Sequence, residues 1–419
     1  MIEFSRFELA NGLRVLVHED DTTPMATVNV LYNVGARDEL PDKTGFAHLF
    51  EHLMFGGSLN VPDFDDPIQL AGGENNAFTN NDMTNFYDTL PAQNIETAFW
   101  LESDRMLSLN FDDQVLDVQR KVVVEEFKET CLNEPYGDMM HLLSDMVYKR
   151  HPYRWPTIGL APSHIEGATM PDVKQFFFRY YRPNNAILVV SGNVKTDQIR
   201  TLAEKWFGDI PRGETFSRNL PEEPEQTEFR QLIKEANVPV DAIYLAFRMA
   251  ARTDPDFYVA DLLSDILCTG PSSRLYRHLL KERQLFSGID CFVSAFIDPG
   301  LFIIEGKPAE GVSLETASAA IWEELEKLKT ELITPPELQK IKNKAESNLV
   351  FSEMSALNKA INLAFFELLG DPDLINKEAQ IYQQISAADI QRVAQQMLRR
   401  ENCSQLCYVA KPVGEPVEN

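Results

Sequence analysis

Two stretches of this chain repeat the same order of elements about 215 residues apart, and this repeat is the strongest constraint on its fold. Residues 172–193 read as a helix followed by an apolar strand, and residues 389–410 read the same way. A second pair, residues 30–39 and 245–254, reads in each copy as a strand that runs into a turn and then a helix. Because these offsets are close to each other, which indicates duplication, we predict two related units within the 419 residues.

The segment between the two copies, residues 211–229, is rich in Pro, Glu and turn-forming residues, which is typical of an exposed linker. We therefore predict a first domain over residues 1–215 and a second, homologous domain over residues 216–419. Within each copy, stretches rich in β-branched and aromatic residues alternate with long helical patterns. The predicted fold class is α+β: two duplicated α/β units, each a mainly antiparallel sheet with helices packed on one face.

The composition argues against several classes of protein. A net charge of −25 disfavours binding to nucleic acid or to an anionic membrane surface, since both depend on Lys and Arg. Five cysteines without paired CxxC motifs indicate neither a disulfide framework nor a thiolate zinc site. No apolar run reaches the ~18 residues of a membrane span, and the N-terminal sequence has no targeting pattern. We therefore expect a folded cytoplasmic protein.

Residues 45–57, GFAHLFEHLMFGG, place two histidines and a carboxylate in an otherwise apolar helix. His48 and His52 are four residues apart, so both imidazoles lie on one face of the helix. Glu51 lies beside that face and could reach a water molecule on a metal held there. This is the inverse of the order in the HExxH zinc motif. The equivalent helix of the second copy, residues 258–270, lacks this trio.

A catalytic zinc site takes three protein ligands, so a third ligand is expected. The helical pattern over residues 114–134 offers Glu125, Glu126 and Glu129 just after a run of three valines. The alternative is that the histidines are ordinary core residues, as a lone buried histidine usually is. That alternative suits the trio poorly, because each of its polar groups needs a partner once it is buried.

These residues carry a family resemblance. The motif HLFEH, followed by 73 residues and then Glu126, resembles the signature of the inverzincin peptidases of the pitrilysin or insulinase-type family, whose two-chain branch is the mitochondrial processing peptidase. Residues 72–87, GGENNAFTNNDMTNFY, resemble the substrate-edge strand of that family. Residues 133–138 and 151–159 resemble its later landmarks, and the duplicated halves match its fold.

The resemblance implies one zinc ion bound by His48, His52 and Glu126, with Glu51 as the general base. The positions of Arg120 and Val122 relative to the family pattern select Glu126 over Glu125. Gln119 stands where the family often has an acidic helper. The edge strand implies that a substrate peptide pairs with the chain around Asn76, Ala77 and Phe78.

One departure from the family pattern bears on partners. Active members hold the substrate with an Arg and a Tyr, and Leu280 and Ser287 fall at those two places here. The resemblance therefore implies a zinc-bearing subunit of a heterodimer, whose homologous partner supplies the Arg/Tyr pair. A homodimer that uses Arg274, Tyr276 or Arg277 is the competing arrangement.

The functional hypothesis is a zinc-dependent endopeptidase that hydrolyses unfolded or short extended peptides inside a two-subunit chamber. The alternative is a non-catalytic assembly or core subunit that shares the fold. Such subunits tend to lose the zinc ligands, and this chain retains the full set. A metallohydrolase that acts on something other than peptides would fit the zinc site but not the substrate-edge strand.

Overall fold

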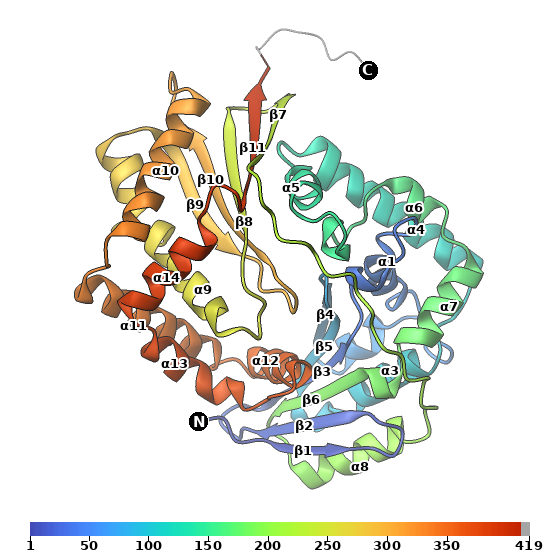
Figure 1. The fold of residues 1–419 in the computed structure, drawn as a ribbon. Helices are drawn as coiled ribbons and strands as arrows, with labels where there is room; N and C mark the ends of the chain where they lie inside the picture. Colours follow the sequence, from blue (N-terminus) through green and yellow to red (C-terminus); the bar gives the residue numbers. More distant parts are fainter. Residues whose placement is uncertain (412–419) are drawn as a thin grey trace. The chain divides into compact units, whose positions relative to one another are not determined.

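A computed structural model describes residues 1–411 of the chain, which fall into two compact units (Figure 1). Unit 1 contains residues 1–128, 155–221 and 349–378, and unit 2 contains residues 129–154, 222–348 and 379–411. These units follow from contacts within the fold, whereas the boundary near residue 215 follows from the linker-like composition of residues 211–229. The two-domain division of the sequence therefore stays a prediction.

Unit 1 is built on a six-stranded sheet. Its strands, in spatial order, are β1 (Ser5–Glu8), β2 (Arg14–Glu19), β6 (Ala186–Gly192), β3 (Met25–Tyr32), β5 (Thr84–Pro91) and β4 (Glu74–Thr79). Only β2 and β6 run parallel, and the other neighbours are antiparallel. Strand β4 therefore lies at an edge of the sheet.

Unit 2 repeats this topology with five strands. Their spatial order is β7 (Arg230–Ala236), β11 (Cys403–Ala410), β8 (Ala242–Arg248), β10 (Leu301–Pro308) and β9 (Phe286–Val293). The first pair, β7 and β11, is parallel, and the remaining pairs are antiparallel. The same order and directions hold for β2, β6, β3, β5 and β4 of unit 1. The predicted fold class, two duplicated α/β units with mainly antiparallel sheets, is confirmed.

Helices from the first half of the chain cover one face of the sheet of unit 1. They are α1 (Phe46–Leu53), α2 (Asp65–Leu70), α3 (Glu96–Leu107), α4 (Asp113–Phe127), α6 (Pro162–Glu166), α7 (Met170–Tyr180) and α8 (Thr196–Phe207). Alternate strand residues such as Val28, Val30 and Leu188 are buried beneath them in one core. This core fixes the position of α1, which carries the His-Glu-His trio.

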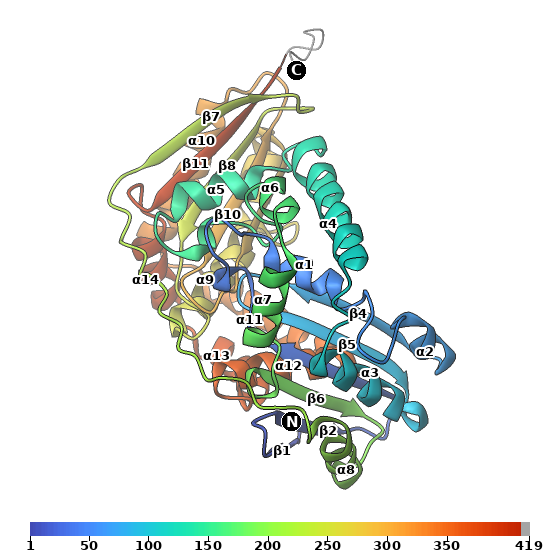
Figure 2. The same cartoon turned by 90° about the vertical axis from the view of Figure 1, so that its right-hand side faces the viewer.

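The other face of this sheet is covered by α12 (Ala356–Leu369), which comes from the second half of the chain (Figure 2). Side chains on both sides of this contact are fully buried: Leu16, Leu31, Ile187 and Val189 from the strands, and Ala360, Leu363 and Ala364 from the helix.

The sheet of unit 2 likewise has helices on both faces. On one face, α5 (Met139–Val147) from the first half of the chain buries Leu143 and Val147 against β8 and β11. The expectation of helices on one face of each sheet is therefore wrong in this detail, because α12 and α5 each cover the second face of a sheet. The other helices assigned wholly to unit 2 are α9 (Pro255–Cys268), α10 (Leu314–Thr330) and α14 (Ala387–Met397). The long helix α11 (Pro335–Ser352) begins in unit 2, and α13 (Leu374–Gln384) ends there. Within residues 1–411, no helix is long and apolar enough to span a membrane.

Candidate metal centre

Helix α1 is amphipathic, and its polar face holds the candidate site. Its residues Phe46, Ala47, Leu49, Phe50 and Leu53 are buried in the core of unit 1, which leaves the intervening positions on the opposite face. The helix begins after Gly45, whose φ of +86° is left-handed. A Cβ at this position would lie 2.8 Å from the backbone oxygen of Ile158, so the position requires glycine.

His48, His52 and Glu126 converge on one point. The Nε2 atom of His48 lies 3.7 Å from Oε2 of Glu126, and the Nε2 atom of His52 lies 3.4 Å from the same oxygen. One donor atom from each residue lies within 4.8 Å of the other two, and no other cluster of this kind occurs within residues 1–411. Ligands about 2 Å from a tetrahedral zinc are about 3.3 Å apart, so these three side chains fit a zinc ion.

The electrostatics of His48 and Glu126 also suit a metal. Burial lowers the pKa of His48, although the nearby Glu126 carboxylate opposes this shift. The hydrogen bond from His52 lowers the pKa of Glu126. Neutral imidazole and ionised carboxylate are the forms that bind a metal. The Nδ1 atom of His48 is buried and has no hydrogen-bond partner within residues 1–411, so no protein group fixes its tautomer.

The structure separates Glu126 from the two other acids that the sequence offered. Glu125 is exposed and pairs with Lys128 at 2.6 Å, on another side of α4. Glu129 lies beyond α4, in the π-helical segment Lys128–Asn133, and does not belong to the metal cluster. Only Glu126 therefore meets the two histidines.

Glu51 lies half-buried on α1 between the two histidines. Burial raises the pKa of its carboxyl, while a hydrogen bond from the hydroxyl of Thr79 and the charge of His52 act in the opposite direction. A carboxylate with a raised pKa is a better general base near neutral pH. The two imidazoles and this carboxylate thus share one helix face.

The substrate-edge strand of the sequence analysis is β4. It pairs with β5 on one side and, within residues 1–411, with no strand on the other. The side chain of Asn76 is exposed, and its Oδ1 accepts a hydrogen bond from the amide of Ala77. Phe78 packs on the α12 side of the sheet. An open strand edge offers main-chain donors and acceptors to an extended peptide.

The residues at the expected Arg/Tyr places lie in unit 2. Leu280 is in the π-helical segment Tyr276–Glu282, and Ser287 on β9 donates to the carbonyl of Lys307. Among the alternatives for a homodimer, Arg274 makes two hydrogen bonds of 2.9 Å to Glu337. A substrate would have to compete with that carboxylate for Arg274.

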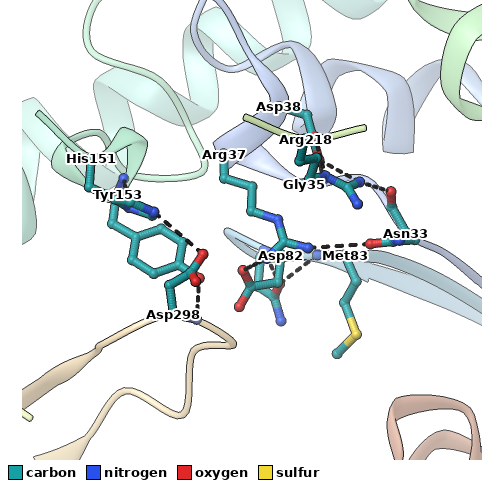
Figure 3. Close-up of polar contacts among 11 residues, drawn as sticks. Asn33, Gly35, Arg37, Asp38, Asp82, Met83, His151, Tyr153, Arg218 and Asp298 are labelled. Atoms are coloured by element: carbon teal, nitrogen blue, oxygen red, sulfur yellow. Dashed lines mark hydrogen bonds and ion pairs between the residues drawn. The ribbon is translucent and has the colours of Figure 1, made fainter. Parts of the chain in front are cut away.

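A turn of residues 36–39, which the sequence analysis did not single out, contacts both α1 and the β4–β5 hairpin. The amides of Ala36 and Arg37 donate to the carbonyls of Asn80 and Asn81, and Arg37 forms a buried ion pair of 2.8 Å with Asp82 (Figure 3). These contacts fix the turn against the hairpin that carries β4.

The last residue of this turn caps the helix. The carboxyl oxygens of Glu39 accept hydrogen bonds from the amides of Gly45 at 2.9 Å and Ala47 at 2.8 Å. Glu39 is buried, and this burial raises its pKa. The available sequence signal was the glycine at the N-cap position, which has no side chain to accept a hydrogen bond from the first turn of α1.

Histidines outside the trio have ordinary partners. The ring nitrogens of four of them meet a carbonyl, a hydroxyl or a carboxylate: His18 with Glu3, His164 with Thr44, His278 with Glu324, and His151 with Asp298, the last drawn in Figure 3. None of these histidines joins a metal cluster within residues 1–411.

The fold is that of a family of peptidases. A family model described as "Insulinase (Peptidase family M16)" matches residues 14–159, and a second, described as "Peptidase M16 inactive domain", matches residues 167–345. The chain therefore belongs to peptidase family M16, and the resemblance to the insulinase-type peptidases is confirmed.

Relatives extend over most of the chain. The "Zinc protease PqqE" of Helicobacter pylori is 29% identical over 397 residues, which cover 93% of this chain and 89% of that protein. The "Mitochondrial-processing peptidase subunit beta" of Saccharomyces cerevisiae is 25% identical, over 82% of this chain and 78% of its own. A crystal structure of a protease from Helicobacter pylori matches with a TM-score of 0.92 and 28% identity, covering 98% of this chain and 100% of that one. Family membership thus places this chain among zinc proteases and their homologues.

Proposed function

We propose that this chain is a zinc-dependent endopeptidase that hydrolyses unfolded or short extended peptides, and that it is the zinc-bearing subunit of a two-subunit chamber. The observation that carries the proposal is the convergence of His48, His52 and Glu126, with Glu51 on the same helix face. The names of the relatives, zinc proteases among them, support the same reaction.

His48, His52 and Glu126 would hold the zinc ion. When bound, zinc polarises the scissile carbonyl and lowers the pKa of a water molecule toward about 7. Glu51 accepts the proton of the attacking water and delivers it to the leaving amine, as a single carboxylate can do in sequence. Its raised pKa favours the first of these two transfers. The open edge of β4, around Asn76, Ala77 and Phe78, pairs with the backbone of the substrate, which tolerates many side chains.

The partner is a homologous subunit that supplies an Arg/Tyr pair. Leu280 and Ser287 can provide neither a guanidinium nor a phenol, and Arg274 is engaged with Glu337. A relative that is itself called a subunit supports a heterodimer. A homodimer remains the second arrangement. We also propose a cytoplasmic location, in line with five buried cysteines that form no disulfide bond within residues 1–411.

A non-catalytic core or assembly subunit is the alternative function. The second family model carries the description "inactive domain", and the missing Arg/Tyr pair would suit a subunit without turnover. The two functions differ in metal content, since an assembly subunit has no need of a full stoichiometry of zinc.

The test is hydrolysis of a library of unstructured peptides by the zinc-loaded chain, alone and with candidate homologous subunits. Glu51→Gln should retain one zinc per chain and lose at least about 100-fold in kcat, because general base catalysis contributes about 10²- to 10⁴-fold. Substoichiometric zinc together with no turnover under any pairing would favour the assembly subunit. Turnover by the chain alone would remove the need for a partner.

A further inference from the structure

Thr79 is the last residue of β4, and its hydroxyl donates a hydrogen bond of 2.6 Å to Oε2 of Glu51. This bond joins the strand that would pair with substrate to the carboxylate that would act as the base. Within residues 1–411, no other group donates a hydrogen bond to Glu51.

A glutamate side chain has three rotatable bonds, so a catalytic carboxylate needs a contact that selects one orientation. The Thr79 hydroxyl occupies one lone pair of Oε2 and leaves Oε1 to accept a proton. Helix α1 fixes the backbone of Glu51, and this bond is the one hydrogen bond within residues 1–411 that orients its carboxylate.

The backbone of Thr79 is itself well fixed. Thr79 is opposite Thr84 in the β4–β5 ladder, and the next amide, that of Asn80, donates to the carbonyl of Met83. The turn that contains Ala36 binds the carbonyl of Asn80 from the other side. The hydroxyl therefore projects from a frame that is held by three sets of main-chain bonds.

We propose that Thr79 is the positioning residue for Glu51, and that it links the alignment of a substrate on β4 to the orientation of the base. This inference rests on the proposed peptidase function and assigns a role that the zinc-binding motif does not contain.

Two substitutions of Thr79 distinguish an effect on the orientation of the Glu51 carboxylate from an effect on the structure of β4. Thr79→Val keeps the shape and the β-branched character of the side chain but removes the hydroxyl. Thr79→Ser keeps the hydroxyl and is the matched control. We expect kcat of Thr79→Val to fall about 10- to 100-fold with KM within about twofold, and Thr79→Ser to recover most of the loss. A substitution that only disturbed β4 would raise KM instead, because the strand binds the substrate backbone.

A second measurement does not depend on turnover. Infrared difference spectra between each zinc-loaded protein and its Glu51→Gln derivative isolate the carboxylate stretch of Glu51. Loss of the hydrogen bond should shift this band in Thr79→Val and leave it in place in Thr79→Ser. An identical band in all three proteins would overturn the inference, whatever the kinetics. Failure of the wild type to cleave peptides in any pairing would overturn the proposed function, while the band would still decide the role of Thr79.

Discussion

Asp88 is fully buried in the core of unit 1 beside a second acid, Glu102, and one cation, Arg105. The Arg105 guanidinium pairs with Glu102 and lies 4.2 Å from the ring centroids of both Phe64 and Phe86. No donor reaches either oxygen of Asp88 within residues 1–411. Burial, followed by the charge of Glu102, raises the pKa of Asp88. We therefore predict that Asp88 is protonated in the folded protein.

This assignment predicts a pH-dependent stability. The pKa of Asp88 is raised in the folded state above its unfolded value of about 3.9, so its contribution is complete below about pH 4 and is lost as pH rises toward the folded-state pKa. Asp88→Asn is neutral at every pH. Calorimetry should show a Tm advantage of Asp88→Asn over the wild type that grows from pH 5 to pH 8. Asp21→Asn, at an exposed position, is the control. A difference that is constant with pH would contradict the assignment.

At the scale of elements, α1 is a short helix whose N-terminus has no cap from its own sequence. Eight residues carry the candidate metal face, and isolated helices of this length are unstable in water. Its N-cap residue, Gly45, has no side chain that could cap the helix. The carboxylate of Glu39 instead accepts hydrogen bonds from the amides of Gly45 and Ala47. The stability of α1 thus depends on a residue that also belongs to the turn against the β4–β5 hairpin.

Glu39→Gln should weaken α1 because an amide NH₂ would face one of the two backbone donors. We expect a loss of about 1–3 kcal/mol in the free energy of unfolding, the usual cost of leaving a buried polar group unsatisfied. Amide hydrogen exchange at Gly45 and Ala47 should become faster than in the wild type. Glu125→Gln replaces an exposed carboxylate on α4 and should leave both measurements unchanged. Unaltered exchange in Glu39→Gln would rule out the capping role.

At the scale of the whole molecule, each sheet is covered by a helix from the other half of the chain. Helix α12 buries one face of the unit 1 sheet, and α5 packs on the unit 2 sheet. Charged contacts reinforce α12: Glu367 pairs with Arg6 and Arg14, and Lys359 with Asp20. A first-half fragment that ends at the linker would lack α12, and one apolar face of the unit 1 sheet would therefore be exposed.

A fragment of residues 1–221 should accordingly be partly unfolded or aggregated and should bind a hydrophobic dye. Addition of a peptide of residues 349–378 should restore a cooperative melt, because it returns the buried contacts of Leu363 and its neighbours. A peptide with Leu363→Ser and Ala364→Ser is the control. A fragment that melts cooperatively without any peptide would show that α12 is dispensable for unit 1.

The sequence by itself determined the elements that depend on local pattern. The repeat predicted two similar units, and the structure has two sheets of the same topology. Strands and helices could be predicted because their periodicities appear within a few residues of sequence. The spacing of His48 and His52 placed both imidazoles on one face, because the geometry of a helix fixes residues four apart.

Only the tertiary structure decided the contacts between distant segments. The residue pattern alone offered Glu125, Glu126 and Glu129 as the third metal ligand, and the family resemblance favoured Glu126. The packing of α4 on α1 brings Glu126 to the two histidines. No spacing in the sequence predicts the hydrogen bonds of Thr79 and Glu39 with α1. The same holds for α5 and α12, which each pack on the sheet of the other half of the chain. Such contacts depend on how elements pack in three dimensions, and the periodicity within one element carries no information about the element it will meet.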